Sequence, residues 1–240
     1  MLDYSQLKRD RHKFLALTGL TIREFEALLP AFAKAYRKGY PPEKTLTKRK
    51  RKRRIGGGRQ GVLKPVEQKL LFILVYQKTY PLQVVLGELF GLSQSGANQW
   101  IHRLLPVLLE ALAALGVTPE RDGPQFGVSE GRKVARRDYV IDGTERRRQR
   151  PKNPEKQALQ YSGKKKAHTD KNVVIVHTRS KRVAYLGPTW PGKTHDKKAA
   201  DRERIAYPRR TVLRKDTGFQ GYEPNVQESL QAKKSRAVRN

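Results

Sequence analysis

The sequence predicts an α+β protein, in which an all-helical N-terminal half is followed by a mixed α/β half. Apolar residues recur at helical spacing up to about residue 115. Beyond a stretch rich in glycine and proline, residues 116–127, the chain changes to short β-branched or alternating runs broken by turn residues. Strands followed by a helix and a further strand are typical of a mixed sheet. At 240 residues the chain is long enough for two domains.

Composition narrows the possible partners. The chain has 52 Lys and Arg against 22 Asp and Glu, a formal charge of +30. So many like charges repel one another, and this excess favours binding to a polyanion. No cysteine is present, so disulfides and thiolate metal sites are excluded. No N-terminal segment resembles a signal peptide, and the longest apolar run, Leu70 to Tyr76, is too short to span a bilayer. We therefore expect a cytoplasmic protein that binds nucleic acid and no membrane.

The first segment, residues 1–47, is expected to be helical. Thr21 and Glu24 form a capping-box pattern, and an apolar stripe follows at helical spacing: Phe25, Leu28, Leu29 and Phe32. Residues 48–61 form a basic, glycine-rich linker with seven consecutive Lys or Arg residues. Such a run is often only a solvated surface, but the excess of the same charge along the chain favours phosphate contact, with these candidates: Arg51, Arg53 and Arg54.

Residues 62–116 predict three helices with a helix-turn-helix pattern. The first runs from Pro65 to about Gln77, the second opens at Pro81 and ends at Gly91, and Ser93 caps the third. The expected inner positions of the last two are Leu82, Val85, Leu86, Leu89, Ile101, Leu104, Leu105, Leu108 and Leu112. Other helical bundles show the same periodicity, but the charge favours DNA binding. The candidate groove-facing residues are Gln94, Ser95, Asn98, Gln99 and Arg103, with His102.

After an expected linker, residues 117–136, the α/β domain is expected to occupy residues 137–240. Its first strand is predicted to end at Asp142, and a three-strand meander follows to about Leu186. A polar-faced helix is expected within residues 192–207, and a further strand stops at Asp216. The two aspartates thus occupy comparable positions at strand ends.

Carboxylates at neighbouring strand ends can converge on one point, where oxygen ligands suit Mg²⁺ or Mn²⁺. Such a site fits two-metal phosphodiester chemistry, and the arginines that follow Asp142 would attract the polyanion: Arg146, Arg147 and Arg148. An aspartate after a strand is also a common turn former, and Asp-Gly is a common turn pair. The residues alone leave both interpretations open.

Several segments together resemble a known family. After the helix-turn-helix come "DGTERRRQRP", "KKKAHTDKNVVIV", "GPTWPGKTHDKKAAD" and "RKDTGFQGYEPN", and this order is similar to that of bacterial transposases of the insertion-sequence five group. The resemblance covers the chain from about Leu17 and implies a ribonuclease H-like catalytic domain. It implies that Asp142 and Asp216 are the first two acids of a DDE metal-binding triad. It also gives Asp196 a structural or substrate-positioning role beside His195, which could equally be a helix-start residue.

The resemblance also implies a third acid, a glutamate on a later helix, and few residues follow Asp216. Glu223 and Glu228 lie directly after the strand, where the family has a loop and a basic connector, so neither fits well. We therefore expect the ribonuclease H-like domain to be incomplete at its C-terminus. On this expectation the chain binds DNA without cutting it efficiently.

The function expected from the resemblance is DNA transposition. The protein would bind the terminal inverted repeats of an insertion element as a homo-oligomer at the bacterial nucleoid, cut with Mg²⁺ or Mn²⁺, and join the 3′ hydroxyl to double-stranded target DNA. One alternative is a non-catalytic, sequence-specific DNA-binding protein in which the sheet domain is a scaffold. Another is a basic RNA-binding or ribosome-associated protein, which lacks support because the aromatic residues lie mostly at periodic core positions.

Overall fold

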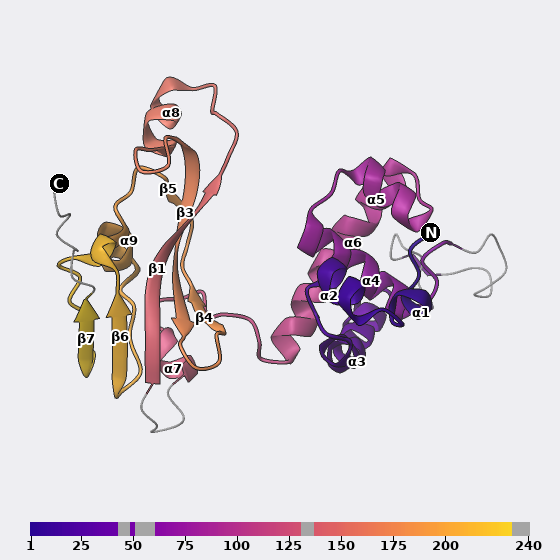
Figure 1. The fold of residues 1–240 in the computed structure, drawn as a ribbon, viewed down its shortest axis with the longest axis horizontal. Coiled ribbons are helices and arrows are strands. Elements are labelled where there is room, and N and C mark those ends of the chain that lie inside the picture. Colours follow the sequence, from indigo (N-terminus) through magenta and orange to yellow (C-terminus); the bar gives the residue numbers. More distant parts are fainter. Residues whose placement is uncertain (43–48, 51–60, 131–136, 232–240) are drawn as a thin grey trace, which may run out of the picture. The chain divides into compact units, whose positions relative to one another are not determined.

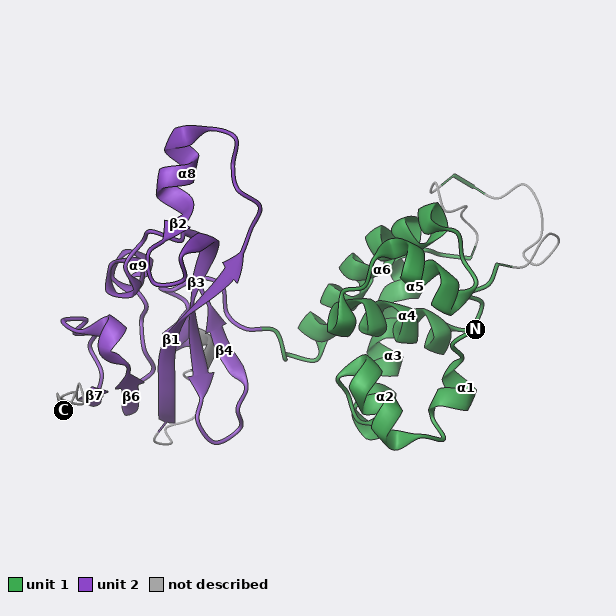
Figure 2. Cartoon of the chain, turned by 45° about the horizontal axis from the view of Figure 1, so that its top comes forward, with its two compact units in different colours: residues 1–118 green, residues 119–240 purple. Residues whose placement is uncertain are grey.

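The computed structural model describes residues 1–42, 49–50, 61–130 and 137–231 (Figure 1). The chain divides into two units, residues 1–118 and 119–240, and each has its own apolar core (Figure 2). The candidate phosphate-binding residues of the basic linker lie outside the described residues: Arg51, Arg53 and Arg54. No helix in the described parts of the chain is long and apolar enough to cross a membrane.

Unit 1 is all-helical. Its elements are α1 (Tyr4–Leu7), α2 (Arg11–Thr18), α3 (Ile22–Gly39), α4 (Val66–Thr79), α5 (Gln83–Phe90) and α6 (Gln94–Ala114). The predicted capping box starts α3, since the Thr21 side chain accepts from the Glu24 amide and the Glu24 carboxylate accepts from the Thr21 amide. Residues 68–75 of α4 are all buried, so this helix runs through the core that the other five surround. Helices α1, α2 and α3 therefore share one core with the later helices.

Helices α5 and α6 form the predicted helix-turn-helix. Gly91 ends α5 with φ of 66°, a left-handed conformation that glycine adopts without strain. The Ser93 side chain caps α6 by accepting from the Gly96 amide at 3.1 Å. A Cβ on Gly87 would lie 2.5 Å from the carbonyl oxygen of Leu92, so a glycine at this position lets the turn pack closely on α5.

The predicted inner face of α5 is wrong at three of four positions. Leu86 is fully buried, but Leu82, Val85 and Leu89 are 74%, 46% and 38% exposed. The helix has only two polar residues, Gln83 and Glu88, so periodicity gave little basis for selecting the buried face. In α6 the predicted positions hold better: Ile101, Leu104 and Leu108 are buried, and Leu105 and Leu112 pack partly against the core.

Unit 2 is built on a mixed sheet (Figure 1). Its elements are α7 (Phe126–Glu130), β1 (Arg137–Arg147), α8 (Pro154–Gln160), β2 (Tyr161–Ser162), β3 (Ala167–His177), β4 (Val183–Leu186), β5 (Trp190–Pro191), α9 (Asp196–Glu203), β6 (Thr211–Lys215), the 3₁₀ turn η1 (Thr217–Phe219) and β7 (Glu228–Gln231). Strand β3 pairs antiparallel with β1 on one edge and with β2, β4 and β5 on the other. Strand β6 is parallel to β1, and β7 is parallel to β6.

One face of this sheet packs on α9. Tyr139 and Ile141 of β1 are fully buried in the same cluster as Ala199 and Ala200 of α9, whereas Val140 and Asp142 are exposed. Side chains alternate along a strand, so Asp142 lies on the face opposite to Tyr139 and Ile141. Helix α9 is predicted correctly within residues 192–207, though it is shorter than that range.

Two sequence-based boundaries in unit 2 need correction. Strand β1 does not end at Asp142 but continues to Arg147, because β3 is equally long and pairs with it as far as Arg147 and Thr169. The expected linker, residues 117–136, is partly structured: Phe126 of α7 is fully buried in the unit 2 core, and Glu120 bridges to Tyr185. Residues 131–136 lie outside the described parts.

Candidate functional site

Asp142 and Asp216 come from neighbouring parallel strands. The last register pair between β1 and β6 joins Ile141 to Lys215, and each aspartate is the next residue along its strand. Asp142 is exposed in the middle of β1, and Asp216 is half-buried directly after β6. Parallel strands are about 4.8 Å apart, so the two backbones are close at this level. The sequence thus predicted the neighbourhood correctly, although only Asp216 follows a strand end.

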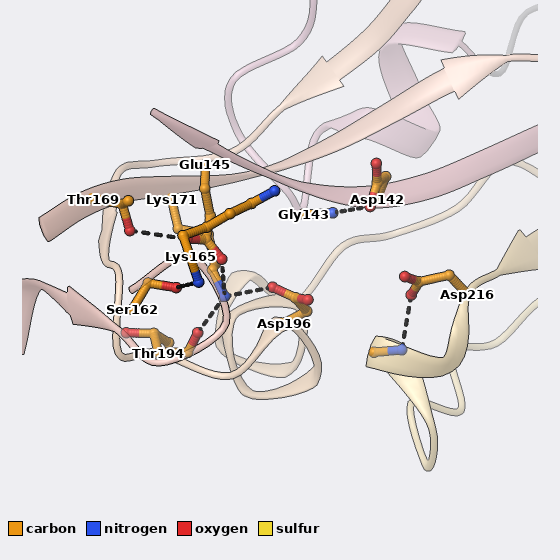
Figure 3. A network of polar contacts seen from close by, with 11 residues as sticks. Asp142, Gly143, Glu145, Ser162, Lys165, Thr169, Lys171, Thr194, Asp196 and Asp216 are labelled. Atoms are coloured by element: carbon orange, nitrogen blue, oxygen red, sulfur yellow. Dashed lines mark hydrogen bonds and ion pairs between the residues drawn. The ribbon is translucent and has the colours of Figure 1, made fainter. Parts of the chain in front are cut away.

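Each of these carboxylates accepts a hydrogen bond from a nearby glycine amide (Figure 3). Asp142 Oδ1 accepts from Gly143 N at 2.7 Å, and Asp216 Oδ1 accepts from Gly218 N at 2.9 Å. The Asp216 contact caps the 3₁₀ turn η1. In each case one carboxylate oxygen is fixed by its own backbone, and the other oxygen makes no such contact among the described residues.

Asp196 brings a third carboxylate to the same region. It is the first residue of α9 and is buried. A Cβ on Gly143 would lie 2.5 Å from Asp196 Oδ1, and a Cβ on Gly218 would lie 2.8 Å from Asp196 Oδ2 and 3.1 Å from Asp216 Oδ1. The Asp196 carboxylate therefore occupies space that a side chain at either glycine would need. Figure 3 shows it on the α9 side of β1, with Asp216 across a short gap.

A buried lysine holds Asp196. Lys171 Nζ lies 2.7 Å from Asp196 Oδ1 and 3.3 Å from Glu145 Oε1, and it donates to the carbonyl oxygen of Thr194 at 2.7 Å. The side chains of Lys171, Glu145 and Asp196 are only 6%, 5% and 12% exposed. The ammonium group, which has three donors, thus lies within ion-pair or hydrogen-bond distance of three oxygens. We call the set Glu145, Lys171 and Asp196 the buried ion triad.

Hydroxyl groups hold Glu145, the member of the triad on β1. Burial alone would raise the pKa of Glu145, but hydrogen bonds from Ser162 and Thr169 and the ion pair with Lys171 outweigh burial and lower it. Thr169 Oγ1 donates to Glu145 Oε2 at 2.9 Å. Glu145 is therefore a stable anion in the folded unit, and the triad carries two negative charges against one positive charge.

The remaining candidate acids and His195 stand apart. His195 is exposed at the N-cap of α9 and makes no capping hydrogen bond through its side chain. Glu228 begins β7 and pairs with Val212 of β6. Because Val212 lies four residues before Asp216, Glu228 is about 13 Å from Asp216 along the strand direction. Glu223 is exposed and lies 3.4 Å from Lys215 Nζ. Within the described residues no three acidic or histidine side chains form a group that could hold a metal ion.

The helix-turn-helix presents the predicted polar residues at the start of α6. Gln94, Ser95 and Gln99 are exposed and Asn98 is half-buried, while Ala97 and Ile101 on the other side of the helix are buried. Arg103 is half-buried, with its guanidinium 5.5 Å from the centre of the Trp100 ring and 3.4 Å from Gln99 Oε1. His102 is exposed beside it. The first two turns of α6 thus form a polar surface on an apolar helix.

The arginines after Asp142 lie at the far end of β1. Arg146 and Arg147 are exposed and form no ion pair within the described residues. Arg148 instead donates to Asp170 Oδ1 at 2.9 Å. Two of the three predicted phosphate-binding residues are therefore free, on the same strand as Asp142.

Sequence reasoning missed the buried ion triad. Lys171 and Glu145 stand among many other charged residues, and nothing in the sequence distinguishes a buried lysine from a solvated one. Gly143 and Gly218 were visible in "DGT" and "DTG", but a glycine after an aspartate first indicates a turn. Two signals were available: the resemblance gave Asp196 a structural or substrate-positioning role, and both aspartates have a glycine within two residues, which is now explained by the position of Asp196.

Comparisons with known proteins agree with the two-part organisation. Residues 62–114 match the helix-turn-helix of DDE superfamily endonuclease, and residues 141–235 match the DDE superfamily endonuclease. A probable transposase for insertion sequence element IS702 from Microchaete diplosiphon is 24% identical over 158 residues, which cover 65% of this chain and 53% of that protein. The chain thus spans about half the length of this curated relative. No solved structure matches the chain.

The first matched segment contains α5, α6 and the polar surface of α6, and the second contains Asp142, the buried ion triad and Asp216. Both models describe parts of one kind of protein, and they occur here in the order helix-turn-helix, then endonuclease. The two matches, in this order, and the similarity to the IS702 protein support a DDE-type insertion-sequence transposase.

Proposed function

We propose that this chain binds the ends of an insertion element and carries out metal-dependent cleavage and transfer of DNA strands, with Asp142 and Asp216 as its first two catalytic acids. The observation that carries this proposal is the register of β1 and β6, in which the two aspartates follow a paired Ile141 and Lys215. The similarity to DDE-type transposases supports the same assignment. The strand order β4-β3-β1-β6-β7, with β6 and β7 parallel to β1, supports a ribonuclease H-like domain.

The chemistry of the donors fits a hard divalent cation. Mg²⁺ is commonly held by one or two carboxylates, with waters and substrate phosphate oxygens as its other ligands. Asp142 and Asp216 each have one oxygen fixed by a glycine amide and a second oxygen available to a ligand. Bound there, Mg²⁺ or Mn²⁺ would stabilise the negative charge that develops on the scissile phosphate.

The chain's own residues would bring the DNA to these acids. The net charge of +30 attracts the phosphate backbone, and the free guanidinium groups of Arg146 and Arg147 lie on the same strand as Asp142. The polar surface of α6 supplies side chains that can contact base edges, chiefly Gln94, Asn98 and Gln99. A homo-oligomer on double-stranded DNA, acting in the bacterial cytoplasm, completes the proposal.

A second candidate is sequence-specific DNA binding without cleavage. It is favoured by one observation, that the described residues contain no group of three acidic or histidine side chains that could hold a metal. The two candidates share the helix-turn-helix and differ in whether Asp142 and Asp216 do chemistry.

One experiment separates them. Duplexes selected by the chain from a random-sequence pool would be labelled, and binding and strand nicking would be measured with Mg²⁺ or Mn²⁺. Transposase chemistry predicts nicking that Asp142→Asn and Asp216→Asn each abolish without weakening binding, while the exposed Asp201→Asn control behaves as wild type. Nicking that survives both substitutions would overturn the assignment of the acids. Binding with no nicking by the unaltered chain would favour the second candidate.

A further inference from the structure

The structure explains why a glycine accompanies each of the two proposed acids. Gly143 follows Asp142 directly, and Gly218 lies two residues after Asp216. The Asp196 carboxylate fills the space beside both glycines, with Oδ1 toward Gly143 and Oδ2 toward Gly218. At 2.5 and 2.8 Å from the positions of the absent Cβ atoms, it excludes any larger residue from either position unless it moves away.

Asp196 is not free to move. Lys171 Nζ binds Asp196 Oδ1 at 2.7 Å and also holds the carbonyl oxygen of Thr194, which lies just before α9. Lys171 is in turn anchored to Glu145 on β1. The start of α9 is therefore fixed to both β3 and β1, which leaves Asp196 Oδ2 facing Gly218 and Asp216.

We propose that Asp196 is a positioning residue that sets the distance between Asp142 and Asp216. Lys171 holds the Asp196 carboxylate between Gly143 and Gly218, where it acts as a wedge. This inference rests on the proposed role of those two acids. Asp216 follows the end of β6 and is no longer held by strand pairing with β1, so its distance from Asp142 depends on what supports the η1 turn. The Asp196 carboxylate supplies that support from the α9 side.

One observation favours positioning over direct metal binding by Asp196: its Oδ1 lies 2.7 Å from Lys171 Nζ. Residues that orient the ligands of a metal, without touching it, typically change metal affinity 10- to 100-fold when they are mutated.

The test is a titration of the full 240-residue chain with Mn²⁺, followed by electron paramagnetic resonance. Asp196→Ala removes the wedge, and Gly143→Ala adds a methyl group that displaces it, so each should weaken Mn²⁺ binding about tenfold. The double substitution should be no weaker than Asp196→Ala alone, because the methyl group then meets no carboxylate. Asp196→Asn keeps the shape and an oxygen for Lys171, and should retain most of the affinity.

Matched controls come from the same unit. Asp201→Asn changes an exposed acid of α9, and Gly163→Ala adds a methyl group where nothing lies within 4 Å. Both should bind Mn²⁺ as the wild type does. Thermal melts without metal would identify any variant whose loss of binding comes from unfolding, and Asp196→Asn, which is isosteric, keeps the test informative if Asp196→Ala does not fold.

Three results would overturn the inference: unchanged Mn²⁺ affinity in Asp196→Ala, a full effect of Gly143→Ala in the Asp196→Ala background, or an equal loss in Asp196→Asn and Asp196→Ala. The last would make the charge of Asp196, rather than its shape, the important property. Failure of the underlying proposal looks different, because Asp142→Asn and Asp216→Asn would then leave Mn²⁺ binding intact.

Discussion

Replacing Lys171 with methionine should destabilise unit 2 strongly. The substitution leaves Glu145 and Asp196 as two nearby carboxylates, 5% and 12% exposed, without the ammonium group between them. Removal of one partner from a buried ion pair costs about 3–5 kcal/mol. Because Glu145 keeps its hydrogen bond from Thr169, we expect about 3 kcal/mol. For a unit of this size that corresponds to roughly 10 °C in the melting temperature.

Fluorescence can follow this loss in unit 2 alone. The chain has two tryptophans, Trp100 in α6 and Trp190 in β5, so a Trp100→Phe background leaves a single reporter in unit 2. Trp190 donates to the buried Glu203 at 2.6 Å and should therefore change its emission on unfolding. The measurement is urea unfolding at neutral pH, with the free energy of unfolding extrapolated to water.

A matched control lies on α9. Lys197 pairs with Asp201 at 2.6 Å, but their side chains are 40% and 42% exposed, so Lys197→Met should cost less than about 0.5 kcal/mol. Adding Glu145→Gln to Lys171→Met should restore part of the stability, because one uncompensated charge disappears. The reasoning is refuted if Lys171→Met costs no more than Lys197→Met.

The other predictions concern the folding of each unit. Leu86→Ala should cost unit 1 about 2–5 kcal/mol, whereas Leu82→Ala should change its free energy of unfolding by under about 0.5 kcal/mol, and equal effects would contradict the assigned face of α5. Gly87→Ala should cost about 1–3 kcal/mol because its methyl group meets a backbone oxygen at 2.5 Å, while Gly39→Ala, with nothing within 4 Å, should be nearly neutral in the same melts. Burial raises the pKa of Glu203 above its ordinary value of 4.5, so the folded state favours the protonated carboxyl group. The contribution of Glu203 to the free energy of unfolding is therefore complete below pH 4.5 and is lost as the pH rises through its pKa in the folded state. Glu203→Gln should therefore gain stability relative to wild type from about pH 4.5 to pH 8 in urea unfolding, and a constant difference would argue against this titration.

Local signals in the sequence predicted most of unit 1. The capping box at Thr21, the helix end at Gly91 and the cap at Ser93 are short-range features that act within one turn, and all three are confirmed. The face of α5 depended on which other helices it meets. A mostly apolar segment carries little information about that, so Leu82 was placed inside and lies outside.

Unit 2 was less predictable because its site depends on contacts between distant segments. The mixed sheet and the neighbouring strands of Asp142 and Asp216 followed from pattern and resemblance. The pairing of Lys171 with Glu145 and Asp196 joins β1, β3 and α9, and depends on strand register. A shift of one residue along β3 would turn Lys171 to the other face of the sheet, and composition cannot detect such a shift.

The central claim, that Asp142 and Asp216 hold one divalent cation between them, can be tested most directly by iron-promoted cleavage of the chain. Fe²⁺ substituted for Mg²⁺ reduces added hydrogen peroxide to hydroxide and a hydroxyl radical, and ascorbate returns the Fe³⁺ to Fe²⁺. The radicals cut the backbone beside the bound ion, and mass spectrometry locates the cuts. We predict cuts close to both Asp142 and Asp216, suppressed by excess Mg²⁺ and absent from both Asp142→Asn and Asp216→Asn. Cuts clustered elsewhere, or an unchanged pattern in the two variants, would contradict the account.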